Sequence, residues 1–408
     1  MTEKQLPKGW HRFAFGEVAK QCRESSSRDD GVFDKYIEGG HMDSNKLNIS
    51  RWGVFGDHYV GPAFHRVFRK GQILYGSRRT YLRKIAIASF DGITANTTFV
   101  IEPVELEGFF SPLLPFVMLS ENFTKHSVSK SKGSTNPYVS WRDLCDFKFA
   151  LPDIDKQKAI YEALNKKQES IEALEGCRLN LGKIFQLLLK DLVCAGVTEK
   201  NVATDIPNGW ELKTLQEVAD YQMGKSFPSV DYTPQGVKLI RPGNLAVDGA
   251  VRWTSSNTIC VSEKYRVDDS EYIVLENEIL MNLTAQSLDD GFLGRVCITG
   301  AGEEALLNQR IARITPTPEG GVNLRFLYWA LKSRLAREYL NRMHVGTKVK
   351  HLYNSELENI PLLIPVDKKK QDEIAEVMDR LVGVAEILSG KAKAIDDLKL
   401  MDVFVLVE

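Results

Sequence analysis

The chain has 408 residues, of which 43% are hydrophobic and 26% are charged, and its formal net charge is −1. This composition predicts a soluble globular protein with enough chain for two cores, and it argues against a membrane protein because no apolar run is long enough to cross a bilayer. The near-zero charge argues against a bulk polyelectrolyte binder, so a nucleic-acid surface would have to be a local patch. No apolar signal core opens the chain and the six cysteines show no paired close spacing, so we expect a cytoplasmic protein.

The chain opens with LPKGW at residues 6–10, and IPNGW recurs at 206–210, an offset of 200 residues. Three further pairs of stretches follow in the same order: FAFGEVAK at 13–20 with LKTLQEVAD at 212–220, KGQILYGS at 70–77 with ENEILMNL at 276–283, and ITANTTFVIEP at 93–103 with LLNQRIARITP at 306–316. The last two pairs alternate apolar and polar residues as strands do. The offset grows from 200 to 206 and then to 213, as loop insertions would produce, so we predict one module written twice.

Each copy closes on a matching segment that leads into a helix. The segments are KGSTNPYVSWRDLCDFKFALP at 132–152 and VGTKVKHLYNSELENIPLLIP at 345–365. Both contain a glycine turn, one helical turn and a short strand that ends in Leu-Pro or Ile-Pro. A glutamine follows shortly after, Gln157 in the first copy and Gln371 in the second, and opens a long predicted helix.

Along both predicted helices apolar residues recur at alternating steps of four and three, which is typical of a coiled-coil seam. The seam residues are Ile160, Leu164, Ile171, Leu174, Leu181, Phe185, Leu188 and Leu192 in the first helix and Ile374, Val377, Leu381, Val384, Leu388, Ile395 and Leu398 in the second. A lone amphipathic helix more often packs on its own domain, but the narrow stripes and matched lengths favour an antiparallel coiled coil.

These patterns predict an α+β fold in which mixed α/β modules alternate with long antiparallel coiled-coil helices, internally duplicated and pseudo-two-fold. The predicted boundaries are 1–152 for the first module, 153–200 for the first helix, 201–366 for the second module and 367–408 for the second helix. The second helix ends in VFVLVE, so its last turns are expected to be short or frayed.

No motif in the sequence predicts catalysis. There is no P-loop, no dinucleotide-binding glycine pattern and no nucleophile elbow. The seven histidines form no metal-ligand spacing with cysteines or carboxylates, so no metal site is expected. The Asn136-Pro137-Tyr138 segment is similar to the catalytic loop of DNA amino-methyltransferases, but one proline and the upstream cofactor loop are missing, which favours a plain turn.

The ordered set of features, occurring twice over nearly the whole chain, resembles the specificity subunit of type I restriction-modification enzymes. The shared features are the Gly-Trp opening, the strand-rich middle, the glycine turns at Gly133-Ser134 and Gly346-Thr347, the Leu-Pro or Ile-Pro followed by glutamine, and the heptad helix. The resemblance implies that each middle is a target recognition domain that reads one half of a split double-stranded DNA sequence. It also implies helices that set the gap and dock two methyltransferase (M) subunits, with restriction (R) subunits joining them. The chain itself would be non-catalytic and without a cofactor, with S-adenosylmethionine on the methyltransferase and ATP and Mg on the nuclease.

Basic and amide side chains in the two modules are the candidates for DNA contacts. GSRRTYLRK at 76–84 has a density of charge that suits phosphate contacts and, for one arginine, guanine readout, although a solvated hairpin is the alternative. Asn96, Thr97 and Thr98 are matched with Asn308, Gln309 and Arg310. The side-chain amides of the Asn and Gln residues suit adenine edges, although the same positions could also simply end a strand. The candidates are Arg78, Arg79, Tyr81, Arg83, Lys84, Asn96, Thr97, Lys130, Lys132 and Ser134 in the first module and Lys225, Ser226, Arg241, Asn244, Gln286, Arg295, Asn308, Gln309, Arg310, Thr347, Lys348 and Lys350 in the second.

Two other classes of function are weighed against the specificity subunit. A stand-alone bipartite DNA-binding protein would work without partners, but no helix-turn-helix signal is present. A self-contained methyltransferase would need a cofactor-binding loop, and the sequence shows none. Strong sequence-specific binding by the isolated chain would favour the former, and DNA methylation by the chain alone would favour the latter.

Overall fold

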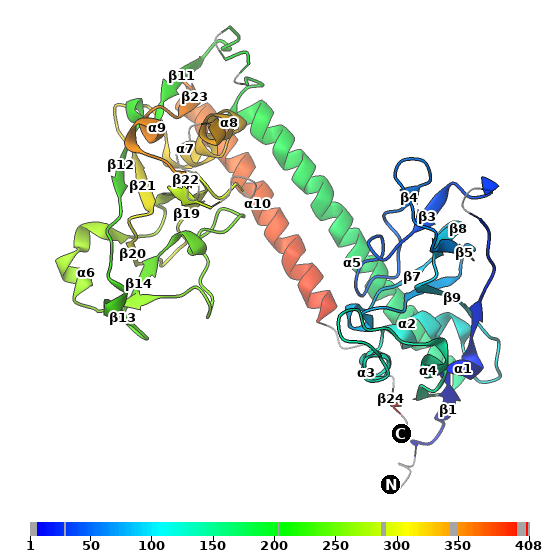
Figure 1. Cartoon of the computed structure of the whole chain (residues 1–408). Coiled ribbons are helices and arrows are strands. Elements are labelled where there is room, and N and C mark those ends of the chain that lie inside the picture. The colour runs from blue at the N-terminus through cyan, green and yellow to red at the C-terminus, as the bar shows by residue number, and fades with distance from the viewer. Residues whose placement is uncertain are drawn as a thin grey trace. The chain divides into compact units, whose positions relative to one another are not determined.

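The computed structural model describes residues 6–27, 30–198, 200–202, 204–286, 291–342, 350–397 and 405–406. The chain divides into two compact units, which Figure 1 shows from the N-terminus in blue to the C-terminus in red. Unit 1 comprises Met1–Gly176 and Ser389–Glu408, and unit 2 comprises Cys177–Leu388. Each boundary between the units falls within a long helix, so each helix contributes to both units.

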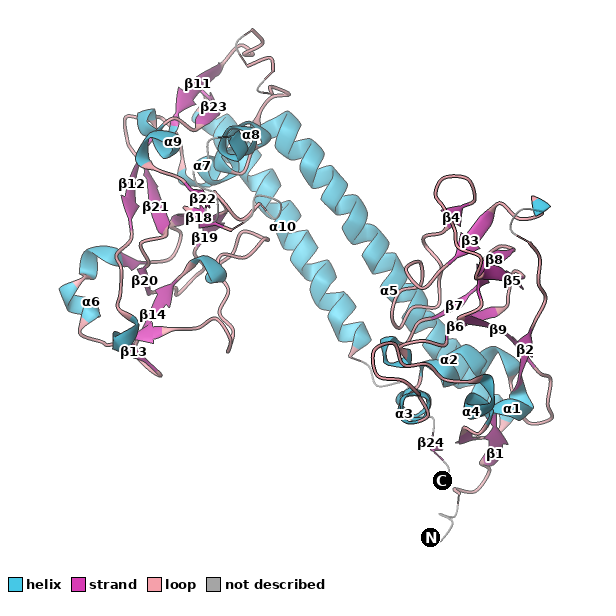
Figure 2. Ribbon diagram, in the orientation of Figure 1, coloured by secondary structure: helices cyan, strands magenta, loops and turns pink. Residues whose placement is uncertain are grey.

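Unit 1 is built from short strands in three small sheets, with short helices beside them (Figure 2). Its elements are β1 (His11–Ala14), α1 (Phe15–Val18), β2 (Ala19–Cys22), β3 (Lys35–Ile37), β4 (Gly53–Val54), β5 (Phe64–Phe68), β6 (Ile73–Gly76), β7 (Ile85–Ile87), β8 (Gly92–Ala95), β9 (Thr98–Pro103), α2 (Leu114–Leu119), α3 (Glu121–Ser129), α4 (Trp141–Cys145), β10 (Lys148–Leu151) and β24 (Val405–Leu406). The strand orders are β2-β9-β6-β7, β4-β3-β8-β5 and β1-β10-β24.

Unit 2 repeats this plan. Its elements are β11 (Trp210–Thr214), β12 (Ala219–Met223), β13 (Tyr232–Thr233), β14 (Val237–Ile240), β15 (Cys260–Val261), α6 (Tyr265–Asp268), β16 (Ile273–Val274), β17 (Ile279–Asn282), β18 (Thr284–Ala285), β19 (Val296–Ile298), β20 (Ala305–Leu307), β21 (Ile311–Pro316), α7 (Leu324–Leu331), α8 (Arg334–Arg342), β22 (Lys350–His351), α9 (Asn354–Glu358) and β23 (Pro361–Pro365). The strand orders are β12-β21-β17-β19, β13-β15-β14-β20-β16, β11-β23 and β18-β22.

The pairing of the strands confirms the internal duplication. The antiparallel pairs β2-β9, β6-β9 and β6-β7 of unit 1 correspond to β12-β21, β17-β21 and β17-β19 of unit 2. The parallel pair β3-β8 corresponds to the parallel pair β14-β20. Ile73 faces Ile101 in the first copy and Ile279 faces Ile314 in the second, so the two registers agree residue by residue.

A fully buried glutamine occupies the same place in both units. The side-chain oxygen of Gln157 accepts a hydrogen bond from the Phe110 amide at 2.9 Å, and its nitrogen donates to the carbonyls of Gly108 and Pro152 at 2.7 and 2.8 Å. Gln371 repeats all three bonds in unit 2. Its side-chain oxygen accepts from the amide of Asn323 at 2.9 Å, and its nitrogen donates to the carbonyls of Gly321 and Pro365, both at 2.8 Å.

The glutamine ties together three parts of each unit: the first turn of the long helix, the end of the preceding strand and a distant loop. The loop glycines, Gly108 and Gly321, both have positive φ angles, +81° and +68°, so the loops also share a backbone conformation that favours glycine. Because every polar group of the glutamine is satisfied inside the fold, the direction in which the helix leaves the module is set by hydrogen bonds as well as by packing.

The two long helices are α5 (Ile154–Leu188), which continues as a short π-helical turn to Val193, and α10 (Lys368–Asp396). Within unit 2, Leu188 near the end of α5 and Leu381 in α10 pack against one apolar cluster that contains Ile374 and Met378. Within unit 1, Lys167 of α5 donates to the carbonyl of Asp396, the last residue of α10, at 2.8 Å. The order of these contacts is that of an antiparallel pair.

Most of the predicted seam residues are buried or partly buried, but Ile160 and Leu164 pack on the unit 1 core and Phe185, Leu188, Leu192, Ile374 and Leu381 on the unit 2 core. Leu164, at 2% exposed, and Ile374, at 5%, are buried, and the partly buried members are Ile160, Ile171, Leu174, Leu181, Phe185, Leu188, Leu192, Leu381, Leu388 and Ile395. Val377 and Val384 are 41% and 45% exposed, so their assignment to the seam was wrong. Leu398 lies outside the described residues.

Both helices are shorter than predicted. Ala195 and Gly196 have φ angles of +47° and +76°, and this left-handed conformation ends α5 well before residue 200. The prediction that the second helix runs to residue 408 was also wrong, because Val405 and Leu406 pair as strand β24 with Ala150 and Phe149 of β10. The Val-Phe-Val-Leu-Val run has the composition of a strand. None of the helices in the described part of the chain combines the length and apolar character of a membrane span.

Replacing Gln157 by alanine should lower the free energy of unfolding of unit 1 by about 3 kcal/mol, because one amide and two carbonyls lose their buried partner. Hydrogen exchange read by mass spectrometry should show lower protection in unit 1 peptides, and Gln371→Ala should do the same in unit 2. Gln186→Ala, at an exposed position of α5, is the control. Equal loss of protection in both units from either substitution would contradict the account.

Candidate nucleic-acid interface

Three segments that the sequence analysis selected in the first module lie together at one end of the unit 1 sheets. They are the loop after β6, the turn before β9 and the segment that follows α3. The Ser77 amide and hydroxyl both donate to the Thr97 carbonyl, at 2.9 and 2.7 Å, and the Val139 amide donates to the Ser77 carbonyl at 2.9 Å. Backbone hydrogen bonds therefore join all three segments.

The exposed candidates on this end form what we call face 1. Its members are Arg78, Arg79, Tyr81, Asn96, Lys130, Lys132 and Ser134, together with Tyr138. The guanidinium of Arg78 lies 5.8 Å from the centre of the Tyr138 ring, and the Arg79 amide donates to the Pro137 carbonyl at 2.7 Å. Tyr138 was not among the contacts predicted from sequence, although an aromatic residue beside a glycine turn is a stacking signal.

Two basic residues of the same loop are engaged with the protein instead. Arg83 donates to the carboxylate of Glu121 at 3.2 Å and to the carbonyl of Leu119, and its side chain is only 24% exposed. Lys84 donates to the carbonyl of Gly39. A dense basic run in a sequence does not reveal which side chains turn inward. Here Arg79 and Arg83, with left-handed φ angles of 50° and 52°, flank a short turn that directs Arg83 toward the protein. Thr97 is partly buried.

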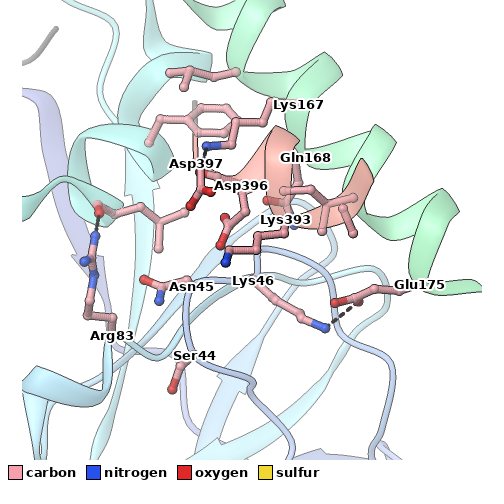
Figure 3. A pocket seen from close by; sticks show the side chains of 15 residues that line it. Ser44, Asn45, Lys46, Arg83, Lys167, Gln168, Glu175, Lys393, Asp396 and Asp397 are labelled. Carbon is pink, nitrogen blue, oxygen red and sulfur yellow. Dashed lines mark hydrogen bonds and ion pairs between the residues drawn. The ribbon is translucent and has the colours of Figure 1, made fainter. Parts of the chain in front are cut away.

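Arg83 also lines a cavity of about 610 Å³ in unit 1 (Figure 3). Its wall includes Lys46, whose ammonium pairs with Glu175 of α5 at 2.5 Å, and the end of α10. Lys167 and Lys393 stand among Glu175, Asp396 and Asp397, so acidic and basic groups are nearly balanced around it. The cavity therefore offers no strong excess of either charge to a ligand.

Unit 2 assembles the equivalent segments with equivalent bonds. The Leu283 amide donates to the Arg310 carbonyl and the Leu352 amide to the Leu283 carbonyl, both at 2.9 Å. The Lys225 amide donates to the Leu307 carbonyl at 2.9 Å, and the Gln309 amide to the Lys225 carbonyl at 3.0 Å. Strand β18 pairs with β22, which brings Ala285 opposite Lys350. We call this end face 2; its exposed candidates are Lys225, Ser226, Gln286, Gln309 and Arg310.

The register of these bonds corrects one match made from sequence. Thr97 and Arg310 make the same bond, so Asn96 corresponds to Gln309, and the earlier match of Asn96 with Asn308 was one residue off. Asn308 itself is only 7% exposed, and its side-chain oxygen accepts from the Arg310 amide at 3.2 Å. Its amide group is therefore part of the turn.

Further candidates in unit 2 are also engaged within the protein. Asn244 is 1% exposed, with its side-chain oxygen on the Arg241 amide at 2.9 Å, so it has no surface from which to reach DNA in this structure. Arg295 donates to the Leu245 carbonyl at 3.1 Å. Lys225 pairs with Asp269, and this hydrogen bond raises the pKa of the lysine. Lys350 is partly buried, whereas Thr347 and Lys348 lie outside the described residues.

The turn that contains Asn244 has a counterpart in unit 1 built on a histidine. There the Glu38 amide donates to Nδ1 of His41 at 3.2 Å, and the ring lies 5.6 Å from that of Tyr36. The pKa of the His41 imidazole is lowered, chiefly because the ring is buried. The Glu38 carboxylate opposes this shift and Arg51 adds to it. Only the neutral imidazole can accept this bond. Within the described residues no group of histidines, cysteines and carboxylates is arranged to hold a metal ion.

Acidification should loosen the turn at His41. Because His41 binds a proton less tightly in the folded state than in the unfolded chain, its contribution to the stability of the turn should be constant above about pH 6.5 and fall as the pH drops below that value. His41→Asn, which copies Asn244, should keep the bond and remove this pH dependence. Exchange of the Glu38 amide, corrected for its intrinsic rate, measures both, and an equal loss of protection in the variant would contradict the assignment.

The fold is duplicated, and each copy presents one polar face built from loops. The family described as type I restriction modification DNA specificity domain matches residues 7–180 and again 207–396. The chain belongs to this family.

Relatives and solved structures agree with that membership. The chain is 26% identical over 286 residues to the type I restriction enzyme MjaVIII specificity subunit of Methanocaldococcus jannaschii, which covers 69% of this chain and 65% of the relative. It is 26% identical over 188 residues to the Escherichia coli EcoAI specificity subunit, covering 46% of this chain and 30% of the relative. The matches thus span less than two thirds of these relatives.

Two solved structures share the fold over nearly the whole chain. The S subunit of a type I restriction-modification system from M. genitalium has a TM-score of 0.65 at 13% identity and covers 100% of both chains. A chain from a structure of complex assembly in a type I R-M system has a TM-score of 0.56 at 18% identity and covers 98% of this chain and 97% of its own.

Proposed function

We propose that the chain is the DNA sequence-specificity subunit of a type I restriction-modification complex, in which each unit reads one half of a bipartite double-stranded target. The observation that carries this proposal is that faces 1 and 2 share their backbone hydrogen bonds but differ in their exposed side chains. Where unit 1 has Asn96 and Thr97, unit 2 has Gln309 and Arg310. A shared frame with different exposed groups suits two readers of different bases.

The exposed cations divide into two proposed roles. Lys130 and Arg310 suit phosphate contacts, which position the protein without reading sequence, whereas the ammonium of Lys132 already pairs with Asp143 at 3.3 Å. Arg78 suits a base contact, because stacking on Tyr138 limits the orientations of its planar fork before DNA arrives. The candidates on both faces remain predictions at the level of single contacts.

The helices are the proposed docking surface for two methyltransferase subunits, with restriction subunits joining that complex. Apolar side chains exposed on the unit 2 portions of α5 and α10 support this role; they are Leu179, Ile184, Leu187, Val377, Val384 and Ile387. Exposed apolar groups on helices are costly for a protein that works alone, which counts against the stand-alone DNA-binding protein. In this proposal the chain is cytoplasmic and non-catalytic, and the partners hold S-adenosylmethionine, ATP and Mg.

The test is to co-express the chain with the methyltransferase encoded beside it and to map adenine methylation by single-molecule sequencing. We expect a split motif, two short specified halves around a fixed gap, that disappears when this chain is omitted. Methylation of one uninterrupted motif regardless of this chain would overturn the proposal. Tight sequence-specific binding by the isolated chain, with no effect on methylation, would favour the stand-alone alternative.

Lys130→Ala should weaken binding of the complex to all DNA sequences alike and reduce the slope of log affinity against log salt by about 1, because one phosphate contact is lost. Titrations at several salt concentrations measure this slope. Lys158→Ala is the matched control, since Lys158 is the fifth residue of α5, next to Gln157, whose side chain bonds the Gly108 loop and not face 1. An unchanged slope in Lys130→Ala would remove that residue from the interface.

A further inference from the structure

The residues that follow β3 and β14 occupy equivalent positions and carry opposite charges. Tyr36 and Ile37 face Ile93 and Thr94 in the parallel pair of unit 1. Leu239 and Ile240 face Leu306 and Leu307 in the parallel pair of unit 2. The next residue is Glu38 in unit 1 and Arg241 in unit 2.

The same turn holds both residues. The Glu38 amide donates to the His41 side chain at 3.2 Å, and the Arg241 amide donates to the Asn244 side chain at 2.9 Å. In both units a side chain three residues later therefore fixes the backbone at this position. A fixed backbone reduces the conformational freedom that the side chain loses when it binds a ligand.

Both residues lie beside segments of the two faces. In unit 2 the Asn308 amide donates to the Ile240 carbonyl at 3.2 Å, which places Arg241 beside the turn that holds Gln309 and Arg310. In unit 1 the ammonium of Lys84 contacts the carbonyl of Gly39, which places Glu38 beside the loop that carries Arg78.

Arg241 has a donor without a partner. The side chain is partly buried, and its Nε is shielded from water with no hydrogen bond in the described structure. Buried donors are nearly always paired, so the guanidinium of Arg241 would have to turn its Nε outward to give this donor a partner on DNA. Arg83 also has a shielded Nε, but its two terminal nitrogens are bonded to Glu121 and Leu119.

The chemistry of the two side chains selects different bases. An arginine fork matches the O6 and N7 acceptors of guanine, whereas a carboxylate accepts from the N4 amino group of cytosine. We infer that Arg241 reads a guanine in the half-site of unit 2 and that Glu38 reads a cytosine amino group at the corresponding position in the half-site of unit 1. This inference rests on the proposed function and adds the identity of one base in each half.

The experiment is the methylation map of the complex with substituted chains. Arg241→Ala should reduce discrimination at a single guanine of one half-site by about 10- to 100-fold. Glu38→Ala should do the same at a single cytosine of the other half-site. Arg334→Ala, which removes an exposed arginine of α8, is the matched control and should leave the motif unchanged.

Arg241→Lys separates base reading from a phosphate contact and from misfolding. A lysine keeps the charge but not the planar fork, so a guanine reader should relax at the same position, whereas a phosphate contact should be largely retained. A uniform loss of methylation at all sites, with the motif unchanged, would overturn the inference. A unit 2 half-site made only of A·T pairs would also overturn it. If the unsubstituted chain directs no split motif, the proposed function has failed instead.

Discussion

Each unit depends on the hydrogen bonds of one buried glutamine. Gln157 and Gln371 each bond an amide and a carbonyl of a distant loop and the carbonyl of the proline that ends the preceding strand. The residue also belongs to the first turn of the long helix. A single amide side chain thus joins three elements by hydrogen bonds, which are much more directional than the apolar packing around them.

The same reasoning explains how one frame carries two different faces. The bonds that join the segments of faces 1 and 2 run largely between backbone groups, such as the Ser77 amide with Thr97 and the Leu283 amide with Arg310. Because these bonds do not depend on the side chains at those positions, the side chains are free to differ between the copies. The turns after β3 and β14 show the limit of this freedom, since either a histidine or an asparagine supplies the acceptor there.

Many of the basic residues near the faces are neutralised within the protein. Lys225 pairs with Asp269, Arg83 with Glu121, and Lys132 with Asp143 at 3.3 Å. Such pairs are compatible with the proposed DNA-reading role at a net charge of −1, because exposed cations outside these pairs would supply the attraction for phosphates. A small number of oriented donors suits discrimination between bases better than a broad positive surface does.

The sequence by itself determined the duplication, the two long helices and most of their buried apolar positions, because repeated strings and heptad spacing are local patterns that survive in a single chain. It also pointed to the glutamines at the helix starts and to the loops that form the faces. Only the tertiary structure decided that Arg83 and Asn244 turn inward, that Asn96 corresponds to Gln309, that Val405 and Leu406 join a sheet, and that Glu38 and Arg241 follow equivalent strands. Those facts depend on partners distant in sequence, and the local pattern of residues contains no information about which distant group will satisfy a given side chain.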